Sequence, residues 1–257
     1  MATMKKYLIF IFFYALAFEG FAQESADPVL NSNNYKKSLT RNKKITLIAP
    51  AALVSLGLIT MLDTDGDEFF LNNFEVREER NENFINFSNQ LDDYLQHIPS
   101  ATAFILSLSG VKGKHDLPNQ LALYLKSELM MLSIVYSLKY TIGEARPDTG
   151  QKNSFPSGHT AQAFTAATFI SKEYGYKSIW ISIGAYTVAT TVGVFRMLNN
   201  RHWVSDILVG AGIGMLSTEL VFRTHKNRWG KRNDLKRVNV DPFSSFGSQG
   251  VSLTYKF

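Results

Sequence analysis

The sequence contains no cysteine, which excludes disulfide bonds, thiolate nucleophiles and cysteine-ligated zinc sites. Alternation of apolar and polar residues is scarce before the C-terminus, which argues against a β protein. The net charge of +5 is too small to indicate a nucleic-acid-binding protein, and the sequence carries no DNA- or RNA-binding motif. We therefore expect no nucleic-acid partner. The mild positive balance suits a membrane surface or a phosphorylated substrate.

The N-terminus has the pattern of a targeting segment. Two lysines precede a largely apolar stretch over residues 7–18, and a small-residue cleavage pattern follows it. We interpret residues 1–22 as a signal peptide, which implies export to the cell envelope. The alternative is a first membrane helix, for which the apolar stretch is short. Residues 23–44 are polar and are interpreted as a linker.

Residues 62–95 are acidic and rich in asparagine. Apolar segments precede and follow this region, with helical periodicity from residue 100 onward, and glycine, proline or charged clusters separate them. They cover residues 45–61, 101–111, 121–142, 160–170, 178–194 and 207–222. We predict an all-α helical bundle over residues 45–225. A basic tail over residues 226–257 follows, with a strand-like end at residues 251–257, where apolar and polar residues alternate.

The segment over residues 207–222 is nearly a membrane span, and the basic run that follows it suits a cytoplasmic tail. Residues 101–111 are too few to cross a bilayer. If a cleaved signal peptide leaves residue 23 outside, five crossings starting at residue 45 bring the tail inside. We therefore expect a membrane-embedded bundle. A soluble periplasmic bundle is the alternative, favoured by the low mean hydropathy of −0.07.

Two clusters between residues 139 and 159 contain the residue types that a phosphate pocket needs. Lys139 and Arg146 are two helical turns apart, so we expect them on one helix face, as phosphate ligands or as solvated cations. Ser157 is a candidate N-cap of a helix. The first amides of that helix, from Gly158 and His159, would then form a phosphate cradle.

A third cluster supplies a candidate nucleophile. His202 and Asp206 are four residues apart and are neighbours if the stretch is helical. A carboxylate that accepts from one ring nitrogen fixes the tautomer and leaves the other nitrogen as a nucleophile. The same spacing also occurs in inert contacts on helix surfaces. Arg196 could add a third cation to the pocket.

In content and order, the K-x6-RP, PSGH and R-x5-H-x3-D clusters resemble those of the type 2 phosphatidic acid phosphatase superfamily, which includes bacterial acid phosphatases and vanadium haloperoxidases. The resemblance extends over roughly residues 100–225. One position departs from the family pattern, because Phe195 stands where the family usually has serine before the third-cluster arginine. This departure puts a secondary hydrogen bond in doubt and leaves the core mechanism intact.

The resemblance implies a role for each cluster residue and requires no metal or cofactor. His202 attacks phosphorus and forms a phosphohistidine, while Asp206 orients its ring. His159 protonates the leaving group and then activates water. The equatorial oxygens are held by Lys139, Arg146, Ser157, Gly158 and Arg196. Because the two histidines need opposite protonation states, we expect a bell-shaped pH profile.

The resemblance and the apolar segments beside the pocket predict a phosphatase for a lipid phosphate or pyrophosphate, in the inner membrane with a periplasm-facing site. Lipid A phosphates, undecaprenyl pyrophosphate and phosphatidylglycerol phosphate are all compatible substrates. A soluble secreted acid phosphatase is the main alternative. A vanadium haloperoxidase would need a longer chain, and a non-catalytic envelope protein would not need the intact set of catalytic residue types.

Overall fold

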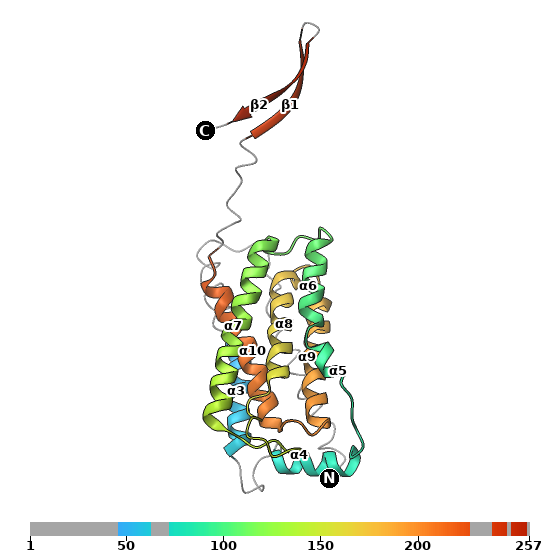
Figure 1. Cartoon of the computed structure of the whole chain (residues 1–257), viewed down its shortest axis with the longest axis vertical. Helices are drawn as coiled ribbons and strands as arrows, with labels where there is room; N and C mark the ends of the chain where they lie inside the picture. The colour runs from blue at the N-terminus through green and yellow to red at the C-terminus, as the bar shows by residue number, and fades with distance from the viewer. Residues whose placement is uncertain (1–45, 63–71, 227–237, 246–247, 256–257) are drawn as a thin grey trace, which may run out of the picture.

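The computed structural model describes residues 46–62, 72–226, 238–245 and 248–255 (Figure 1). The expected signal peptide and polar linker lie outside these residues. The helices are α3 (Ile48–Leu62), α4 (Asn73–Asn83), α5 (Leu91–Leu95), α6 (Ile98–Leu108), α7 (Leu117–Ile142), α8 (Gly158–Tyr174), α9 (Ile179–Leu198) and α10 (Val204–Thr224). The predicted helical bundle is confirmed. Two strands, β1 (Val238–Ser245) and β2 (Ser248–Tyr255), follow it.

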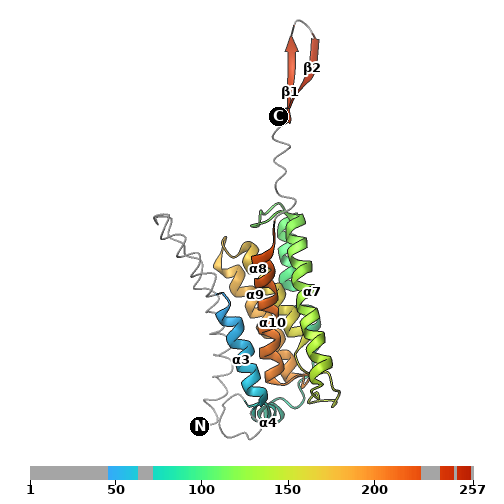
Figure 2. The same ribbon diagram turned by 90° about the vertical axis from the view of Figure 1, so that its left-hand side faces the viewer.

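The bundle has two ends, which we define by the connections that lie there. The site end holds the loops over residues 143–157 and 199–203, and the far end holds the connections over residues 109–116 and 175–178. The long helices run between these ends in alternating directions (Figures 1 and 2). At the far end, the hydroxyl of Thr46 donates to the Glu219 carboxylate in α10 at 2.6 Å.

The direction of α6 contradicts the five-crossing topology. Helix α5 lies at the site end, whereas the amide of Lys114, beyond α6, donates to the Glu173 carbonyl at the far end. The chain therefore traverses the bundle between residues 91 and 111. Helix α6 has only 11 residues, but the short α5 precedes it almost without a break and extends the path. The structure thus has six traverses, not five.

Helix α10 is the central helix, since 83% of its most apolar stretch is buried inside the protein. Glycines on two of its faces allow neighbouring backbones to approach closely. A Cβ atom on Gly210 would lie 2.6 Å from the Ser157 carbonyl oxygen at the start of α8. A Cβ atom on Gly212 would lie 2.8 Å from the Pro50 carbonyl oxygen in α3. The glycines therefore set the position of α8 and α3.

Three helices, α7, α9 and α10, are long and apolar enough to cross a membrane. Helix α7 lies at the outside of the bundle, and only 22% of its most apolar stretch is buried. Large apolar or aromatic side chains are exposed along its whole length at helical spacing, at Leu121, Leu125, Leu129, Leu132, Tyr136 and Tyr140. An exposed apolar stripe of this length suits contact with lipid acyl chains.

The C-terminal strands pair as an antiparallel hairpin, with Val238 opposite Tyr255 and Ser245 opposite Ser248. Strand β2 overlaps the segment over residues 251–257 whose alternation predicts a strand. Strand β1, in which Pro242 interrupts a short alternation, was not predicted.

Candidate active site

The candidate nucleophile His202 lies in the turn between α9 and α10, and Asp206 is the third residue of α10. The His202 Nδ1 atom is 3.1 Å from Asp206 Oδ2. The same carboxylate oxygen accepts from the Trp203 amide at 3.0 Å, which fixes the start of α10. The expected pair is therefore present, although His202 precedes the helix. Both residues are buried, with 3% and 0% of their surface exposed.

This geometry sets the protonation of the His202 ring. An ionised carboxylate only accepts hydrogen bonds, so the proton lies on Nδ1 and the lone pair lies on Nε2. Burial lowers the pKa of His202 to about 4, and the neighbouring Asp206 opposes that shift only in part. The ring is consequently neutral at physiological pH, as a nucleophile must be.

Lys139 and Arg146 do not share a helix face, so that prediction is wrong. Helix α7 ends because Gly143 adopts a left-handed conformation, with φ of 63°, and Arg146 follows in the loop. Lys139 Nζ donates to the carbonyl oxygens of Asn153 at 2.7 Å and Ser154 at 3.1 Å. Arg146 Nε donates to Asn153 Oδ1 at 2.6 Å. Residues of one loop segment thus hold both cations.

Ser157 occupies the N-cap position of α8, and its amide donates to the Asp206 carbonyl at 3.0 Å. Its hydroxyl accepts from the Thr160 hydroxyl at 2.9 Å and makes no side-chain cap bond to the backbone. The first amides of α8, from Gly158 and His159, are therefore not capped by the Ser157 side chain. A helix N-terminus of this kind attracts an anion.

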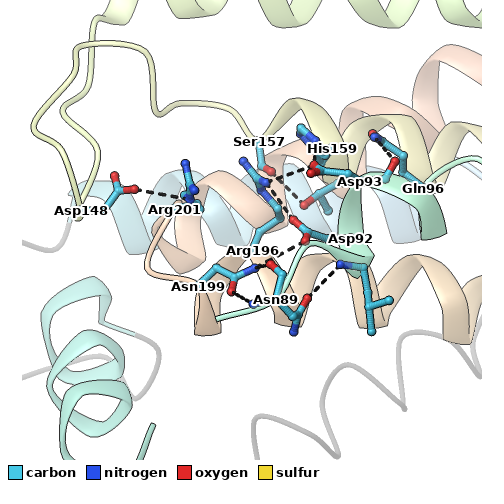
Figure 3. Close-up of polar contacts among 12 residues, drawn as sticks. Asn89, Asp92, Asp93, Gln96, Asp148, Ser157, His159, Arg196, Asn199 and Arg201 are labelled. Atoms are coloured by element: carbon cyan, nitrogen blue, oxygen red, sulfur yellow. Dashed lines mark hydrogen bonds and ion pairs between the residues drawn. The ribbon is translucent and has the colours of Figure 1, made fainter. Parts of the chain in front are cut away.

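Two carboxylates that the sequence analysis did not identify bind the other site residues (Figure 3). Arg196 Nη1 is 2.8 Å from Asp92 Oδ2, and this ion pair is buried. His159 Nε2 is 2.7 Å from Asp93 Oδ1. Both aspartates belong to α5, which has five residues and is too short to show helical periodicity. The acidic composition of this region was the only available signal.

Helix α4 lies across the site end of the bundle and supports the site loops (Figure 1). Arg77 Nη2 donates to the Pro147 carbonyl at 2.9 Å, and Arg80 Nε donates to the Leu198 carbonyl at 2.9 Å. The Arg77 guanidinium also stacks 5.3 Å from the ring centroid of Trp203. This polar helix was not predicted, because it has no apolar face.

Phe195, the departure from the family pattern, packs against Phe87 with a centroid distance of 5.7 Å. Phe87 belongs to the connection between α4 and α5. In the same connection, the Asn89 amide donates to Asn199 Oδ1 at 3.0 Å. The aromatic pair thus helps to anchor the chain that leads to α5 and its aspartates.

The site residues of all three clusters come together at one end of the bundle. Lys139 and Arg146 are close enough to Asp206 to interact with it electrostatically, and Arg146 and Arg196 act in the same way on His202. An anion placed here would be surrounded by three cations and would face the neutral His202 ring. Among the described residues, no group of three or more histidine or acidic side chains has a metal-binding arrangement.

Residues 120–230 match the sequence model of the PAP2 superfamily. A lipid A 1-phosphatase from Porphyromonas gingivalis is 36% identical over 178 residues, which are 69% of this chain and 38% of that protein. The chain belongs to the PAP2 superfamily. A PA-phosphatase related-family protein from Dictyostelium discoideum is 26% identical over 131 residues, 41% of this chain and 48% of that protein. The PAP2 chain spans less than half the length of either curated relative.

Two crystal structures are also similar to this PAP2 protein. LpxE from Aquifex aeolicus is 23% identical, with a TM-score of 0.43, over 59% of this chain and 94% of the other. A transmembrane PAP2-type phosphatidylglycerolphosphate phosphatase from Bacillus subtilis is 20% identical, with a TM-score of 0.45, over 70% and 98% of the two chains.

Proposed function

We propose that this protein is a metal-independent phosphatase that hydrolyses a lipid phosphate or pyrophosphate through a phosphohistidine on His202. The observation that carries the proposal is the buried, neutral His202 ring, which Asp206 holds and on which Arg146 and Arg196 act electrostatically. These are the groups that phosphoryl transfer to nitrogen requires: a lone pair, fixed positive charge and a group that protonates the leaving oxygen.

In the first half of the proposed reaction, His202 Nε2 forms a bond to phosphorus as the bond to the leaving oxygen breaks. His159 donates a proton to that oxygen. In the second half, His159 accepts a proton from water, the water oxygen bonds to phosphorus and the P–N bond breaks. Lys139, Arg146 and Arg196 would stabilise the charge on the equatorial oxygens, with the Gly158 amide and Ser157 beside them.

A lipid substrate is supported by the position of the site on the bundle. The exposed apolar stripe along α7 ends at Tyr140, next to Lys139. An acyl or isoprenoid chain could therefore lie along the bundle while its phosphate enters the site. The Porphyromonas gingivalis relative is a lipid A 1-phosphatase, so a lipid A phosphate is one candidate substrate. Undecaprenyl pyrophosphate and phosphatidylglycerol phosphate are the others.

We further propose that the site end faces the periplasm from the inner membrane. Lysines occupy the described connections of the far end, at Lys112, Lys114, Lys177 and Lys226, and the basic run over residues 226–237 continues them. Such an excess of cations marks a cytoplasmic side. The site end also has cations, but Arg77, Arg80 and Arg146 are bonded to its loops.

With six traverses, this orientation conflicts with a cleaved signal peptide. Thr46 contacts Glu219 near the end of α10, so the start of α3 lies on the proposed cytoplasmic side. A cleaved signal would leave residue 23 on the outer side. The two are compatible only if the chain crosses once more between residues 23 and 45.

The test is phosphate release by the detergent-purified full chain, with EDTA present, from a panel of the three lipid phosphates and of water-soluble phosphate esters. We expect release from at least one lipid and its loss in His202→Ala. His97→Ala is the matched control, because His97 is exposed and lies outside the three clusters. Release only from soluble esters would support the secreted acid phosphatase. Equal release by His202→Ala would refute the mechanism.

A further inference from the structure

A second carboxyl group lies behind the candidate nucleophile. The side chain of Glu144, in the loop after α7, lies within hydrogen-bonding reach of the side chain of Asp206. Its main-chain carbonyl accepts from the Ser154 amide at 2.9 Å, and the Ser154 hydroxyl donates to Asp206 Oδ2 at 2.5 Å. Glu144 is therefore part of the network that holds Asp206 against His202.

The two carboxyl groups have unequal sets of donors. Asp206 Oδ2 accepts from the Ser154 hydroxyl, the Trp203 amide and His202 Nδ1. Asp206 Oδ1 and Glu144 Oε2 are both buried, and within the described part of the chain neither receives a hydrogen bond from an amide, amine or hydroxyl group. Two ionised carboxylates cannot satisfy each other, whereas one proton between them satisfies both.

We propose that Glu144 is protonated in the resting protein and donates a hydrogen bond to Asp206, which makes it a positioning residue for the His202 nucleophile. This inference rests on the proposed function, because it concerns the same site. The proton lies on Glu144 because three donors stabilise the negative charge of Asp206. Burial raises the pKa of Glu144 to about 8, and the nearby Asp206 charge acts in the same direction.

Among the described residues, no hydrogen bond joins Glu144 to a cation of the site, and the buried Nε atoms of Arg77 and Arg196 have no partner. Lys139 from α7 binds main-chain carbonyls, Arg146 binds the Asn153 side chain, and Arg196 from α9 pairs with Asp92. Asp206 from α10 is the charged group that acts on Glu144; Arg77 from α4 binds the Pro147 carbonyl, and His202 in the turn binds Asp206. A neutral Glu144 therefore leaves one negative charge beside His202.

Ionisation of Glu144 would put a second negative charge beside Asp206 and remove the donor to Oδ1. Activity should therefore fall as the pH rises through the pKa of Glu144, in addition to the alkaline limb that deprotonation of His159 produces at lower pH, since burial lowers the pKa of His159. In Glu144→Gln, the side-chain amide donates a hydrogen bond at every pH. This variant therefore keeps the donor to Asp206 but removes the titratable proton. In Glu144→Ala the donor is absent at every pH, and the buried Asp206 Oδ1 is left unsatisfied.

The first experiment compares the pH dependence of kcat and KM for the wild type and both variants on the best substrate of the panel. We expect Glu144→Gln to retain a higher kcat at pH 7 than Glu144→Ala and to lose the part of the alkaline fall near pH 8 that Glu144 causes, while the alkaline limb from His159 remains. For Glu144→Ala we expect kcat to fall on the order of tenfold at every pH, with KM little changed. An unchanged alkaline fall in Glu144→Gln, or wild-type kcat in Glu144→Ala, would overturn the proposal.

The second experiment does not depend on activity. Infrared difference spectra between the wild type and Glu144→Gln at pH 7 should contain the carbonyl band of one protonated carboxyl group, and that band should disappear as the pH passes about 8. Glu82→Gln, at an exposed position of α4, should give no such band. Absence of the band in the wild type would refute protonation of Glu144. If the band is present but no substrate is hydrolysed, the proposed function fails and the shared proton stands.

Discussion

Burial determines which state of His202 is present at the site. The charged imidazolium is disfavoured away from water, and the adjacent Asp206 carboxylate compensates only in part, so the pKa falls to about 4. The nucleophilic lone pair is consequently available over most of the pH range. A histidine exposed to water would be protonated, and so lack this lone pair, in half of the molecules at its reference pKa of about 6.5.

The acid limb of the pH profile follows from this shift. Lowering the pH protonates His202 only near its folded-state pKa, so kcat/KM should keep its plateau down to about pH 5 and fall near pH 4. The measurement is kcat/KM across the acid range in buffers of constant ionic strength. An acid limb near pH 6.5 would show that His202 is solvated or is not the titrating nucleophile.

The role of Asp206 as the hydrogen-bond acceptor of His202 Nδ1 can be tested with a side chain of the same size. In Asp206→Asn, the amide can donate to Nδ1 and stabilise the tautomer with its proton on Nε2, which removes the lone pair from the attacking atom. We expect kcat to fall by about two to four orders of magnitude with a small change in KM. Asp148→Asn is the control, because Asp148 is a carboxylate of the loop over residues 143–157 whose partners are Arg201, at 3.6 Å, and the Thr149 amide, at 2.7 Å, rather than His202. A fall of less than threefold for Asp206→Asn would contradict the assigned role.

The residues of the three clusters were predictable because their spacing or their chemistry carries a signal. The i, i+4 pair of His202 and Asp206 holds even though His202 is not helical, because the capping turn brings the ring back to the carboxylate. The partners of Arg196 and His159 were not predictable. Asp92 and Asp93 lie more than 60 residues away in sequence, and only the folded chain brings them to the site.

At the scale of elements, the contact between α8 and α10 positions the anion-binding end of α8. Gly210 permits the close approach of the Ser157 carbonyl, so the start of α8 and the start of α10 have fixed relative positions. The amide of Ser157 also donates to the Asp206 carbonyl. The geometry between the phosphate cradle and the nucleophile therefore depends on a glycine that touches neither substrate nor histidine.

Gly210→Ala tests this dependence. The added Cβ would lie 2.6 Å from a backbone oxygen, so α8 must shift, which costs about 1–3 kcal/mol in a well-packed interior. We expect a lower thermal midpoint in detergent together with a reduced kcat. Gly184→Ala in α9 is the matched control, because nothing lies within 4 Å of its added Cβ. Equal midpoints and activities in the two variants would show that the contact does not position the site.

Apolar periodicity predicted the long helices well, because each buries one stripe against α10 or its neighbours. It failed for α4 and α5. Helix α4 is mostly polar, with Val76 as its buried apolar side chain and Asn72 as its N-cap, and is held by long-range bonds from Arg77 and Arg80 to the site loops. The predicted end of the segment at residue 142 matches the end of α7, but the shared helix face of Lys139 and Arg146 is wrong, because the left-handed Gly143 ends the helix before Arg146.

At the scale of the whole molecule, the alternating directions of the helices put all three clusters at one end and the lysine-rich connections at the other. The natural absence of cysteine makes this arrangement easy to test, since any single introduced cysteine gives an unambiguous label. Thr149 and Ser109 are exposed residues at the site end and the far end respectively.

We expect a membrane-impermeant maleimide to label Thr149→Cys in spheroplasts and to leave Ser109→Cys unlabelled until the membrane is permeabilised. Labelling of both variants in intact spheroplasts would indicate a soluble periplasmic bundle. Labelling of Ser109→Cys alone would reverse the proposed orientation. The sequence alone could not predict which connections share an end of the bundle, because the direction of α6 depends on how α5 joins it and not on the length of either helix.

The central claim, a covalent intermediate on His202, is tested most directly by the stereochemical course at phosphorus. The substrate would be a lipid phosphate made chiral with oxygen isotopes and sulfur, hydrolysed with EDTA present. Each in-line displacement inverts phosphorus, so transfer to His202 followed by attack of water predicts net retention of configuration. Net inversion would show that water attacks the substrate directly and would contradict the phosphohistidine mechanism.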